Sequence, residues 1–305
     1  MKKRVSIVIV NWNGYDDTVV ALNSLKKIDR REYEVSVIVV DNGSTNDSVS
    51  VIQKSHSWVT LIETGKNLGF TGGNNVGIKA AMKDGADFVW LLNNDIVADK
   101  SALSILEAFE DSHCGIAGSK IYFAPGKEYH KDWYSKNERG KVFWYAGGII
   151  DWDNMYASHR GVDEVDEGQY DTTEETPFIT GCSMMIKREV IETIGILDDK
   201  FYLYLEDLDF CLRAKQAGYK LLYLPKSIIW HVNAGSSGGP GNPMHEYYLT
   251  RNRLLVGMRY APIRTKLALV REAIRFLAVG STIKRKAVLD ALICKFGNRY
   301  EPKKF

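Results

Sequence analysis

The chain has 305 residues, of which 45% are hydrophobic and 26% are charged, and its formal net charge is +2. This composition excludes a largely disordered protein, because it supplies enough apolar side chains for a large buried core. The four cysteines are too scattered for a Cys-x-x-Cys metal site and too few for a disulfide scaffold, so we expect reduced thiols. No apolar stretch approaches the roughly 20 residues of a membrane-spanning helix, so we expect any membrane contact to be peripheral.

The first 120 residues alternate short β-branched runs with amphipathic stretches, which predicts strands separated by helices. Strands are expected at residues 5–10, 35–40, 59–62 and 88–92. The first two runs are apolar almost throughout, which is typical of strands covered on both faces in a parallel sheet. The predicted fold class is therefore α/β, with a mostly parallel twisted sheet flanked by helices.

Three of these strands run directly into polar clusters. The clusters are Asn11-Trp12-Asn13-Gly14, Asp41-Asn42-Gly43-Ser44 and Asn93-Asn94-Asp95. In parallel sheets, ligands bind beyond the carboxyl ends of the strands. We therefore expect the three clusters to form one site.

Asp95 follows a buried strand, where the backbone is held firmly. A single carboxylate in such a place suits Mg²⁺ or Mn²⁺, which complete their coordination with phosphate oxygens and water. The alternative is a turn residue, or a cap for a helix that starts near Lys100. Residues 67–75 are rich in glycine and asparagine but lack the Gly-Lys-Ser/Thr ending of a P-loop. They are expected to start a helix close to a ligand.

Residues 123–177 are rich in aromatic, glycine and acidic residues and are expected to form irregular loops and hairpins. A strand is expected near 183–186, a helix near 206–217 and a strand at 220–224. The predicted helix opens with Glu206-Asp207-Leu208-Asp209 after an aromatic run. Aromatic neighbours desolvate a carboxylate and raise its pKa, which favours a general base, whereas the alternative is favourable capping of the helix dipole.

His231 follows another apolar run and could be a metal ligand, a phosphate donor or a structural residue. The following segment, 235–243, contains four glycines and two prolines and is expected to be a mobile lid. Residues after Met244 are expected to be helical. Residues 262–305 carry a net charge of +8, with apolar positions at helical spacing that include Leu267, Val270 and Ile274. This predicts either peripheral contact with an anionic membrane or helices packed on the domain or on a second subunit.

Taken together, the motifs resemble glycosyltransferase family 2, the inverting enzymes with a GT-A (nucleotide-diphospho-sugar transferase) fold, and within it the rhamnosyltransferase-like branch. The resemblance covers residues 4 to about 260 and rests on Val-Ser-Ile-Val-Ile-Val-Asn-Trp-Asn-Gly, the segment 39–47, Asn-Leu-Gly-Phe-Thr-Gly-Gly-Asn-Asn, Leu-Leu-Asn-Asn-Asp and Tyr-Leu-Glu-Asp-Leu-Asp-Phe-Cys-Leu-Arg. It implies a catalytic domain at 1–243, with a nucleotide-binding half at 1–120 and an acceptor half at 121–243. A basic helical extension follows at 244–305.

The resemblance also implies roles for individual residues. Asp207 matches the family's general base, and Glu206 is expected to support it. Asp95 matches the metal-binding end of the family's Asp-x-Asp signature, which here reads Asn93-Asn94-Asp95, and His231 is expected to supplement this weakened metal site. The expected nucleotide-binding residues are Asn11, Asn13, Asp41, Asn67, Gly69, Asn74, Asn94 and Arg251.

The predicted function is that of a metal-dependent glycosyltransferase of the hexosyltransferase class, active in cell-surface polysaccharide synthesis. The expected donor is dTDP-rhamnose, with UDP sugars as the alternative, and the expected acceptor is a glycan or a lipid-linked glycan. Two alternative hypotheses are an inactive sugar-nucleotide-binding protein and a nucleotidyltransferase. We expect a cytoplasmic protein that does not bind nucleic acid, and we leave open peripheral attachment to the inner face of the membrane and a homodimer.

Overall fold

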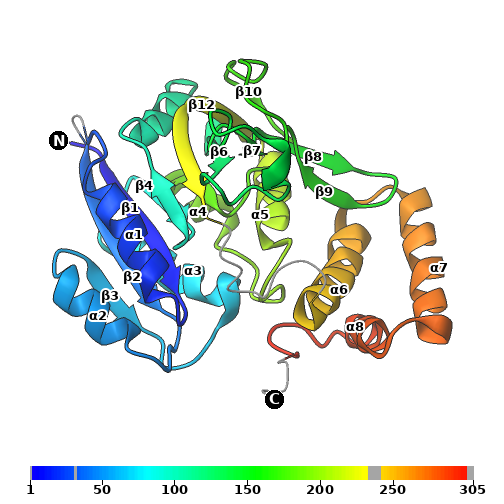
Figure 1. The fold of residues 1–305 in the computed structure, drawn as a ribbon. Helices are drawn as coiled ribbons and strands as arrows, with labels where there is room; N and C mark the ends of the chain where they lie inside the picture. Colours follow the sequence, from blue (N-terminus) through cyan, green and yellow to red (C-terminus); the bar gives the residue numbers. More distant parts are fainter. Residues whose placement is uncertain (1, 31–32, 233–241, 301–305) are drawn as a thin grey trace.

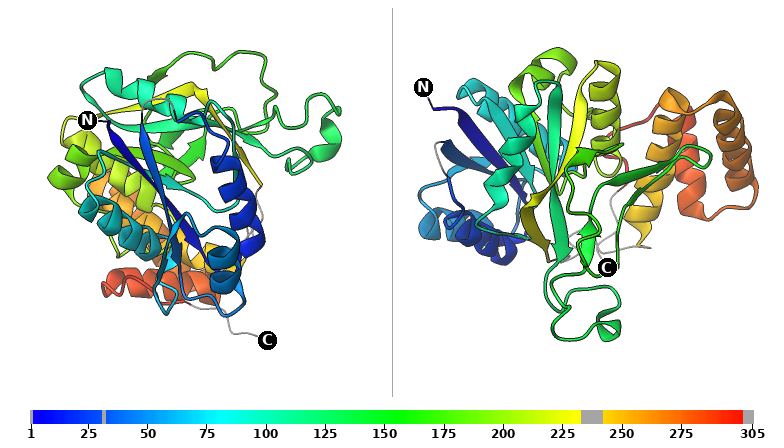
Figure 2. Two further views of the ribbon diagram at one scale, coloured as in Figure 1. Left: turned by 90° about the vertical axis from the view of Figure 1, so that its left-hand side faces the viewer. Right: turned by 90° about the horizontal axis from the view of Figure 1, so that it is seen from above.

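The computed structural model describes residues 2–30, 33–232 and 242–300. A central sheet is flanked by helices, and three further helices stand beside it at the C-terminal end of the chain (Figures 1 and 2). The expected lid, 235–243, lies outside the described residues except for its last two positions. Of these, Pro243 is the first residue of a helix, a position where its fixed backbone angle is favourable.

Within the described residues the sheet has ten strands, and its main path runs β10-β12-β6-β11-β4-β1-β2-β3. The pairs β1–β2, β1–β4, β2–β3 and β12–β6 are parallel, whereas β11 is antiparallel to both of its neighbours. The bounds of the strands on this path are β1 (Arg4–Asn11), β2 (Glu34–Asp41), β3 (Thr60–Glu63), β4 (Phe88–Leu92), β6 (Cys114–Phe123), β10 (Glu174–Glu175), β11 (Ser183–Lys187) and β12 (Lys220–His231). Two short strands, β5 (Ile96–Ala98) and β7 (Phe143–Tyr145), pair with β12 and β6.

Helices cover both faces of the sheet, as the apolar runs predicted. On one face, Ile7 and Ile9 belong to a core that includes apolar residues of α1 (Tyr15–Leu25). On the other face, Val8 belongs to a core that includes residues of α3 (Gly69–Lys83) and α5 (Glu206–Gln216). The remaining helices of this part are α2 (Ser48–Ser55), α4 (Arg188–Ile194) and the 3₁₀ helices η1 (Ala102–Glu110) and η2 (Lys131–Trp133).

Glycines bring α3 unusually close to β1. A Cβ atom at Gly77 would lie 2.2 Å from Cγ1 of Val8, and one at Gly73 would lie 2.7 Å from Cγ1 of Val10. Gly73 and Gly77 therefore serve helix–sheet packing. This refines the expectation that they bring the helix close to a ligand.

Two element boundaries differ from the sequence expectation. The last long strand continues past Leu224 to His231, with a register shift between Leu224 and Ile228 against β6. The helix expected near Lys100 is a 3₁₀ helix. The region 123–177 is irregular, as expected, and includes the hairpin of β8 (Gly148–Asp151) and β9 (Tyr156–His159).

The C-terminal part is helical, as predicted, and comprises α6 (Pro243–Tyr260), α7 (Ile263–Val279) and α8 (Thr282–Leu292). Helix α6 joins this part to the domain, because Val256 belongs to the same core as α5. Helix α7 lies at the edge of the molecule, far from β1 and β2 (Figure 1). Within the described ranges, no helix is long and apolar enough to span a bilayer.

Candidate active site

The first two polar clusters are joined by their side chains. Asn11 is completely buried and donates from Nδ2 to Asp41 Oδ2 at 2.8 Å, while the backbone N–H of Ser44 donates to Asp41 Oδ1 at 2.9 Å. Because parallel pairing places Asn11 beside Asp41, both lie at the same edge of the sheet. These contacts fix the orientation of the Asp41 carboxylate. Asn11 therefore holds the Asp41 carboxylate in place. This structural role does not depend on any contact between Asn11 and a ligand.

A second set of amide contacts joins β2 to the start of α3. Asn42 donates from Nδ2 to the Gly69 carbonyl at 3.0 Å and accepts from the Leu68 N–H at 3.0 Å. Asn67 Oδ1 accepts from the Gly69 N–H at 2.8 Å. Gly69 has φ of +72°, and a Cβ atom there would lie 2.4 Å from the carbonyl oxygen of Tyr202. Only glycine fits this position, where the start of α3 meets the loop before α5.

The third cluster joins the first through α1. Asn94 donates from Nδ2 to Thr18 Oγ1 at 3.1 Å, and Thr18 in turn donates to Asn11 Oδ1 at 2.8 Å. The three polar clusters therefore form one connected network at the carboxyl edge of the sheet, as the sequence predicted.

Two predicted nucleotide residues have mainly local contacts. Asn74 is 2% exposed and donates to the Phe70 carbonyl one turn earlier in α3. Asn13 has φ of +55°, and its Oδ1 accepts from the N–H of Thr45. These contacts stabilise the first turns of α3 and the loop after β1.

Asp95 and His231 meet at the same edge. His231 Nε2 lies 3.2 Å from Asp95 Oδ1, and both residues are buried. Their backbones are brought together because β5, which follows Asp95, pairs with the end of β12. His231 Nδ1 is buried without a hydrogen-bond partner in the described part of the chain. That part contains no group of three or more His, Cys, Asp or Glu side chains arranged to hold a metal ion.

A further acid, Asp17, lies near Asp95 on the first turn of α1. Burial and then the charge of Asp95 raise the pKa of the Asp17 carboxyl. Sequence reasoning missed this residue, because only the packing of α1 on the sheet brings it to the site.

Glu206 and Asp207 are the first two residues of α5, and Glu206 is buried while Asp207 is half-buried. The N–H of Gly181 donates to Asp207 Oδ2 at 2.9 Å. Burial raises the pKa of Asp207, and burial followed by the charge of Asp207 raises the pKa of Glu206 well above its usual range. Within the described residues, Oε2 of Glu206 has no hydrogen-bond partner. Burial thus raises the pKa of both carboxyl groups, whereas capping of the helix dipole alone would lower it.

Asp209 has a different environment although it lies on the same helical turn. It is completely buried and accepts from Arg213, Arg259 and Tyr260 at 2.9, 2.6 and 2.8 Å. Its charge is therefore neutralised by structural ion pairs that join α5 to α6. Glu206 and Asp207 are the two carboxyl groups left for chemistry.

The turn before these acids is strained. Tyr202, Tyr204 and Leu205 all have φ between +66° and +69°, a region that costs a non-glycine residue about 1–2 kcal/mol. Asn252 on α6 holds this turn by donating to the carbonyls of Phe201, Leu203 and Tyr204 at 3.1, 2.8 and 2.8 Å. The contacts of α6 therefore fix the backbone that leads into the acid pair.

Arg251 braces the same turn. Its guanidinium is completely buried and donates to the carbonyls of Lys200, Phe201 and Gly297. The family resemblance offered two roles for this residue, contact with the diphosphate or bracing of the expected lid, which lies almost wholly outside the described residues. Its contacts in the structure are those of a brace.

Asp95 and Asp207 lie near the same short segment, residues 181–182. Gly181 donates to Asp207, and the carbonyl of Cys182 accepts from the N–H of Asn93 at 3.1 Å. Burial and then the charges of Asp95 and Asp207 raise the pKa of the Cys182 thiol well above its usual range. Both carboxylates therefore lie close to Cys182.

Two aromatic neighbours of His231 were also missed by the sequence analysis. The ring of Trp144 lies 4.4 Å from the His231 ring and 4.3 Å from the His159 ring. Burial lowers the pKa of His159 to about 4, so its ring is neutral at physiological pH. Both residues come from the irregular region 123–177, where no periodic pattern signalled their position.

Comparisons with known proteins identify the family and the fold of the chain. The family model for glycosyl transferase family 2 matches residues 6–195, more than half of the chain. Among curated relatives, a low-salt glycan biosynthesis hexosyltransferase of Haloferax volcanii is 27% identical over 215 residues. That alignment covers 70% of this chain and 62% of the relative, so the chain spans less than two thirds of that protein.

Two further relatives are rhamnosyltransferases by name. A dTDP-rhamnosyl transferase of Shigella flexneri is 24% identical, over 84% of this chain and 80% of its own length. An N-acetylglucosaminyl-diphospho-decaprenol L-rhamnosyltransferase of Mycobacterium tuberculosis is 25% identical, over 68% of this chain and 69% of its own length.

Solved structures share the fold. GalNAc-T7, with UDP, GalNAc and Mn²⁺, has a TM-score of 0.58 at 17% identity, covering 82% of this chain and 48% of that one. A mannosyltransferase from Pyrobaculum calidifontis, in complex with GDP-Man and Mn²⁺, has a TM-score of 0.56 at 16% identity, covering 96% and 75%. The predicted GT-A fold is thereby confirmed. Together with the family match over residues 6–195, this establishes that the chain belongs to glycosyl transferase family 2.

Proposed function

We propose that this protein is an inverting glycosyltransferase that moves one sugar from a nucleoside-diphosphate donor to an acceptor hydroxyl in glycan synthesis. The observation that carries the proposal is that Asp95 and Asp207 both lie near the segment 181–182: Asp207 accepts from the Gly181 N–H, and the charges of both carboxylates raise the pKa of the Cys182 thiol. Asp95 lies at the edge where the polar clusters gather. Asp207 is a desolvated carboxylate that forms no ion pair among the described residues. This arrangement suits sugar transfer, in which the charge on the leaving diphosphate is stabilised near Asp95 while Asp207 removes a proton from the acceptor hydroxyl.

The donor pocket is proposed at the network around Asp41, Asn42 and Asn67. Asp41 is suited to accept from a pyrimidine ring N–H, because its carboxylate is already oriented by Asn11 and Ser44. Asn94 and Gly69 border the same network. We favour dTDP-rhamnose as the donor, supported by the two rhamnosyltransferase relatives, and keep UDP sugars as the alternative.

We propose that Asp95 and His231 hold Mg²⁺ or Mn²⁺. The fit rests on their own arrangement, since His231 Nε2 faces Asp95 Oδ1 at 3.2 Å and a carboxylate oxygen is a ligand that both ions accept. Two protein ligands are enough when donor phosphates supply others. When bound, such an ion would stabilise the negative charge that develops on the leaving diphosphate. Full activity in excess chelator would contradict the metal assignment.

Asp207 is proposed as the general base. As the acceptor oxygen forms its bond to the anomeric carbon, Asp207 takes the hydroxyl proton, and the bond from that carbon to the diphosphate breaks on the opposite face. General-base assistance of this kind contributes roughly 10²- to 10⁴-fold. Glu206 is proposed to support this step as a hydrogen-bonding group, because its Oε2 is buried and free of partners within the described residues.

The acceptor half is proposed at residues 121–243, opposite the nucleotide-binding half at 1–120, with residues 244–305 as an extension. Trp144 and His159 lie next to His231 and would border the acceptor sugar. Aromatic rings in this position provide an apolar face for a sugar ring. A glycan or a lipid-linked glycan is the proposed acceptor, and the similarity to the mycobacterial N-acetylglucosaminyl-diphospho-decaprenol L-rhamnosyltransferase supports the second choice.

The test is a thermal-shift panel of nucleotide sugars with and without Mn²⁺, followed by product analysis. We expect dTDP-rhamnose to raise Tm more than UDP sugars do, and more in the presence of Mn²⁺. Incubation with an acceptor is expected to release free nucleoside diphosphate. Release of pyrophosphate would instead indicate nucleotidyl transfer, and binding with no product under any condition would indicate a binding protein.

A further inference from the structure

Helix α7 carries an apolar stripe that faces away from the protein. Ile263, Leu267, Val270 and Ile274 are 74%, 66%, 45% and 62% exposed. Their spacing of four, three and four residues places them on one face of the helix. Large apolar side chains exposed singly need no explanation, but a continuous row of them marks an interaction surface.

The opposite face of α7 already secures the helix to the domain. Leu269 and Ala273 are buried, and Leu269 packs so closely on α6 that a Cβ atom at Gly257 would lie 2.2 Å from it. Thr265 donates to the carbonyl of Trp152 in the β8–β9 hairpin at 2.9 Å. The sequence left open whether this helix packs on the domain or faces a membrane. The inner face of α7 packs on the domain, and the apolar stripe on its outer face remains exposed.

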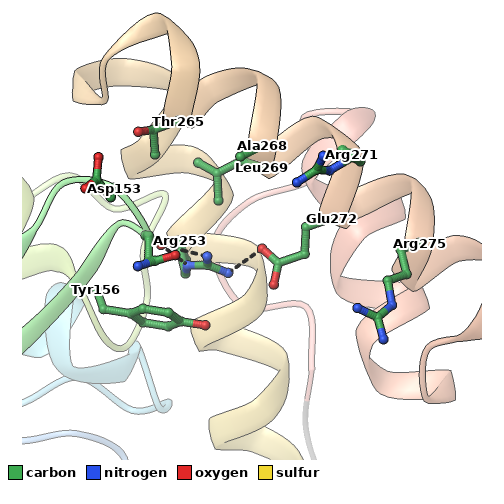
Figure 3. Close-up of a pocket in the computed structure, with 10 residues that line it drawn as sticks. Asp153, Tyr156, Arg253, Thr265, Ala268, Leu269, Arg271, Glu272 and Arg275 are labelled. Atoms are coloured by element: carbon green, nitrogen blue, oxygen red, sulfur yellow. Dashed lines mark hydrogen bonds and ion pairs between the residues drawn. The ribbon is translucent and has the colours of Figure 1, made fainter.

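Cations line the flank of the apolar stripe. Arg264, Arg271 and Arg275 follow one another at spacings of seven and four residues, which forms a row beside the stripe. Figure 3 shows the recess that two of them border, between α7, α6 and the hairpin. Its volume is about 350 Å³, and Arg271 and Arg275 line it together with the Arg253–Glu272 ion pair.

The charges on α7 and α8 are strongly one-sided. Together the two helices contain seven Lys and Arg and only two acids, Glu272 and Asp290. Both acids are already paired, Glu272 with Arg253 and Asp290 with Lys286. Helix α8 adds the exposed apolar residues Leu289 and Leu292. A second copy of this surface would bring like charges together, whereas an anionic surface would complement them.

We propose that the outer face of α7 docks on an anionic phospholipid surface. The apolar stripe enters the headgroup boundary, and the arginine row, with its recess, binds lipid phosphates. This placement would bring the chain to the surface where lipid-linked acceptors lie. The proposal concerns binding alone, so it stands or fails independently of the transfer reaction.

The test is co-sedimentation of the full chain with vesicles of phosphatidylcholine, with or without phosphatidylglycerol. Three variants accompany the wild type: L267S/I274S in the stripe, R271Q/R275Q in the cation row, and V20S/V162S as a control at exposed apolar positions outside the C-terminal helices. We expect binding to vesicles that contain phosphatidylglycerol. The stripe variant should lose about tenfold or more in partition, and the cation variant about fivefold per charge removed.

The control should bind like the wild type, and all variants should keep the wild-type Tm. Three results would overturn the proposal. They are no binding by the wild type, binding that the stripe variant retains in full, and equal loss in the control. Sedimentation velocity without lipid distinguishes the competing occupant, since a dimer that L267S/I274S dissociates would make this face a subunit interface.

Discussion

Three carboxyl groups on the first turn of α5 show how strongly neighbours decide the role of a residue. Asp209 is neutralised by Arg213 and Arg259, whereas Glu206 and Asp207 have buried surroundings and raised pKa values. All three are equivalent in a helix-capping interpretation of the sequence. Only the packing of α6 on α5 distinguishes the structural acid from the two acids that are available for chemistry.

The raised pKa of Asp207 predicts a pH dependence. A base acts in its ionised form, so kcat/KM should fall as the pH falls through the pKa of Asp207. Because burial raises this pKa, the midpoint should lie above the ordinary aspartate value of about 4. The check is the pH–rate profile at saturating metal. Activity that stays constant to below pH ~4 would contradict the assignment of Asp207 as base.

Glu206 predicts a trade-off between function and stability. Its pKa is raised on folding, so its stabilising contribution is complete below the ordinary carboxyl pKa and is lost as pH rises through the raised value. Glu206→Gln removes this loss, and we expect a higher Tm than wild type at neutral pH, with lower activity. Thermal unfolding at several pH values checks this. The gain should shrink as the pH falls, and a gain that persists unchanged in acid would mean that another effect stabilises the variant.

At the scale of single residues, sequence reasoning found the residues that sit in compact motifs. Asp41, Asp95, Glu206 and Asp207 all stand beside apolar strands or an aromatic run, so their motifs signalled them. Thr18 and Trp144 gave no such signal, because their place in the site depends on how one element packs on another.

At the scale of elements, the turn before α5 has a strained backbone that side chains of α6 hold in place. Tyr202, Tyr204 and Leu205 are in the left-handed region, and Asn252 and Arg251 hold the carbonyls around them. Strained backbone persists where the surrounding structure over-determines it, and it gathers at functional sites. We infer that α6 acts as a positioning element for Asp207.

This role predicts the effect of Asn252→Ala. The substitution removes three donated hydrogen bonds and lets the turn relax, so kcat should fall at least about tenfold while the donor dissociation constant stays near the wild-type value. Steady-state kinetics and calorimetric titration of the donor check the split. Asn154→Ala, on the exposed hairpin turn, is the control and should leave both unchanged. A variant with lowered Tm but wild-type kcat would reduce Asn252 to a purely structural residue.

The close approach of α3 to β1 predicts that Gly77→Ala changes the free energy of unfolding. The sign of that change shows whether Gly77 is an ordinary helix glycine or is required for packing on β1. In an ordinary helix, Gly→Ala stabilises by about 0.5–1 kcal/mol. Here the new Cβ would lie 2.2 Å from Val8, so Gly77→Ala should destabilise by about 1–3 kcal/mol. Urea unfolding measures the change. A stabilised variant would show that α3 can move away from the sheet without cost.

The sequence predicted most elements, because β-branched runs and helical spacing are local signals. It placed β1, β2, β4 and the C-terminal helices correctly. It ended β12 early, because the register shift after Leu224 depends on pairing with β6. It also attributed the glycines of α3 to ligand contact, because the sequence cannot show which face of a helix meets a sheet.

At the scale of the whole molecule, one antiparallel strand completes the site. Strand β11 lies between β4 and β6 and is antiparallel to β4. Its first residue, Ser183, pairs with Leu92, so Gly181 and Cys182 lie at the carboxyl end of β4. Asp95 and Asp207 are far apart in sequence, and both lie near this segment, since the charges of both raise the pKa of the Cys182 thiol. No local pattern in the sequence contains this information, since strand order is decided by long-range packing. Only the family resemblance implied that Asp95 and Asp207 act in the same site.

The most direct test of this account compares Asp95→Asn and Asp207→Asn with the wild type in one experiment. Donor affinity is measured by calorimetry with and without Mn²⁺, and nucleoside diphosphate release is measured with acceptor present. Asp95→Asn should lose the part of donor affinity that depends on Mn²⁺. Asp207→Asn should keep donor affinity but lose turnover by roughly 10²- to 10⁴-fold. Turnover by Asp207→Asn at the wild-type rate, or donor affinity of Asp95→Asn that still responds fully to Mn²⁺, would contradict the account.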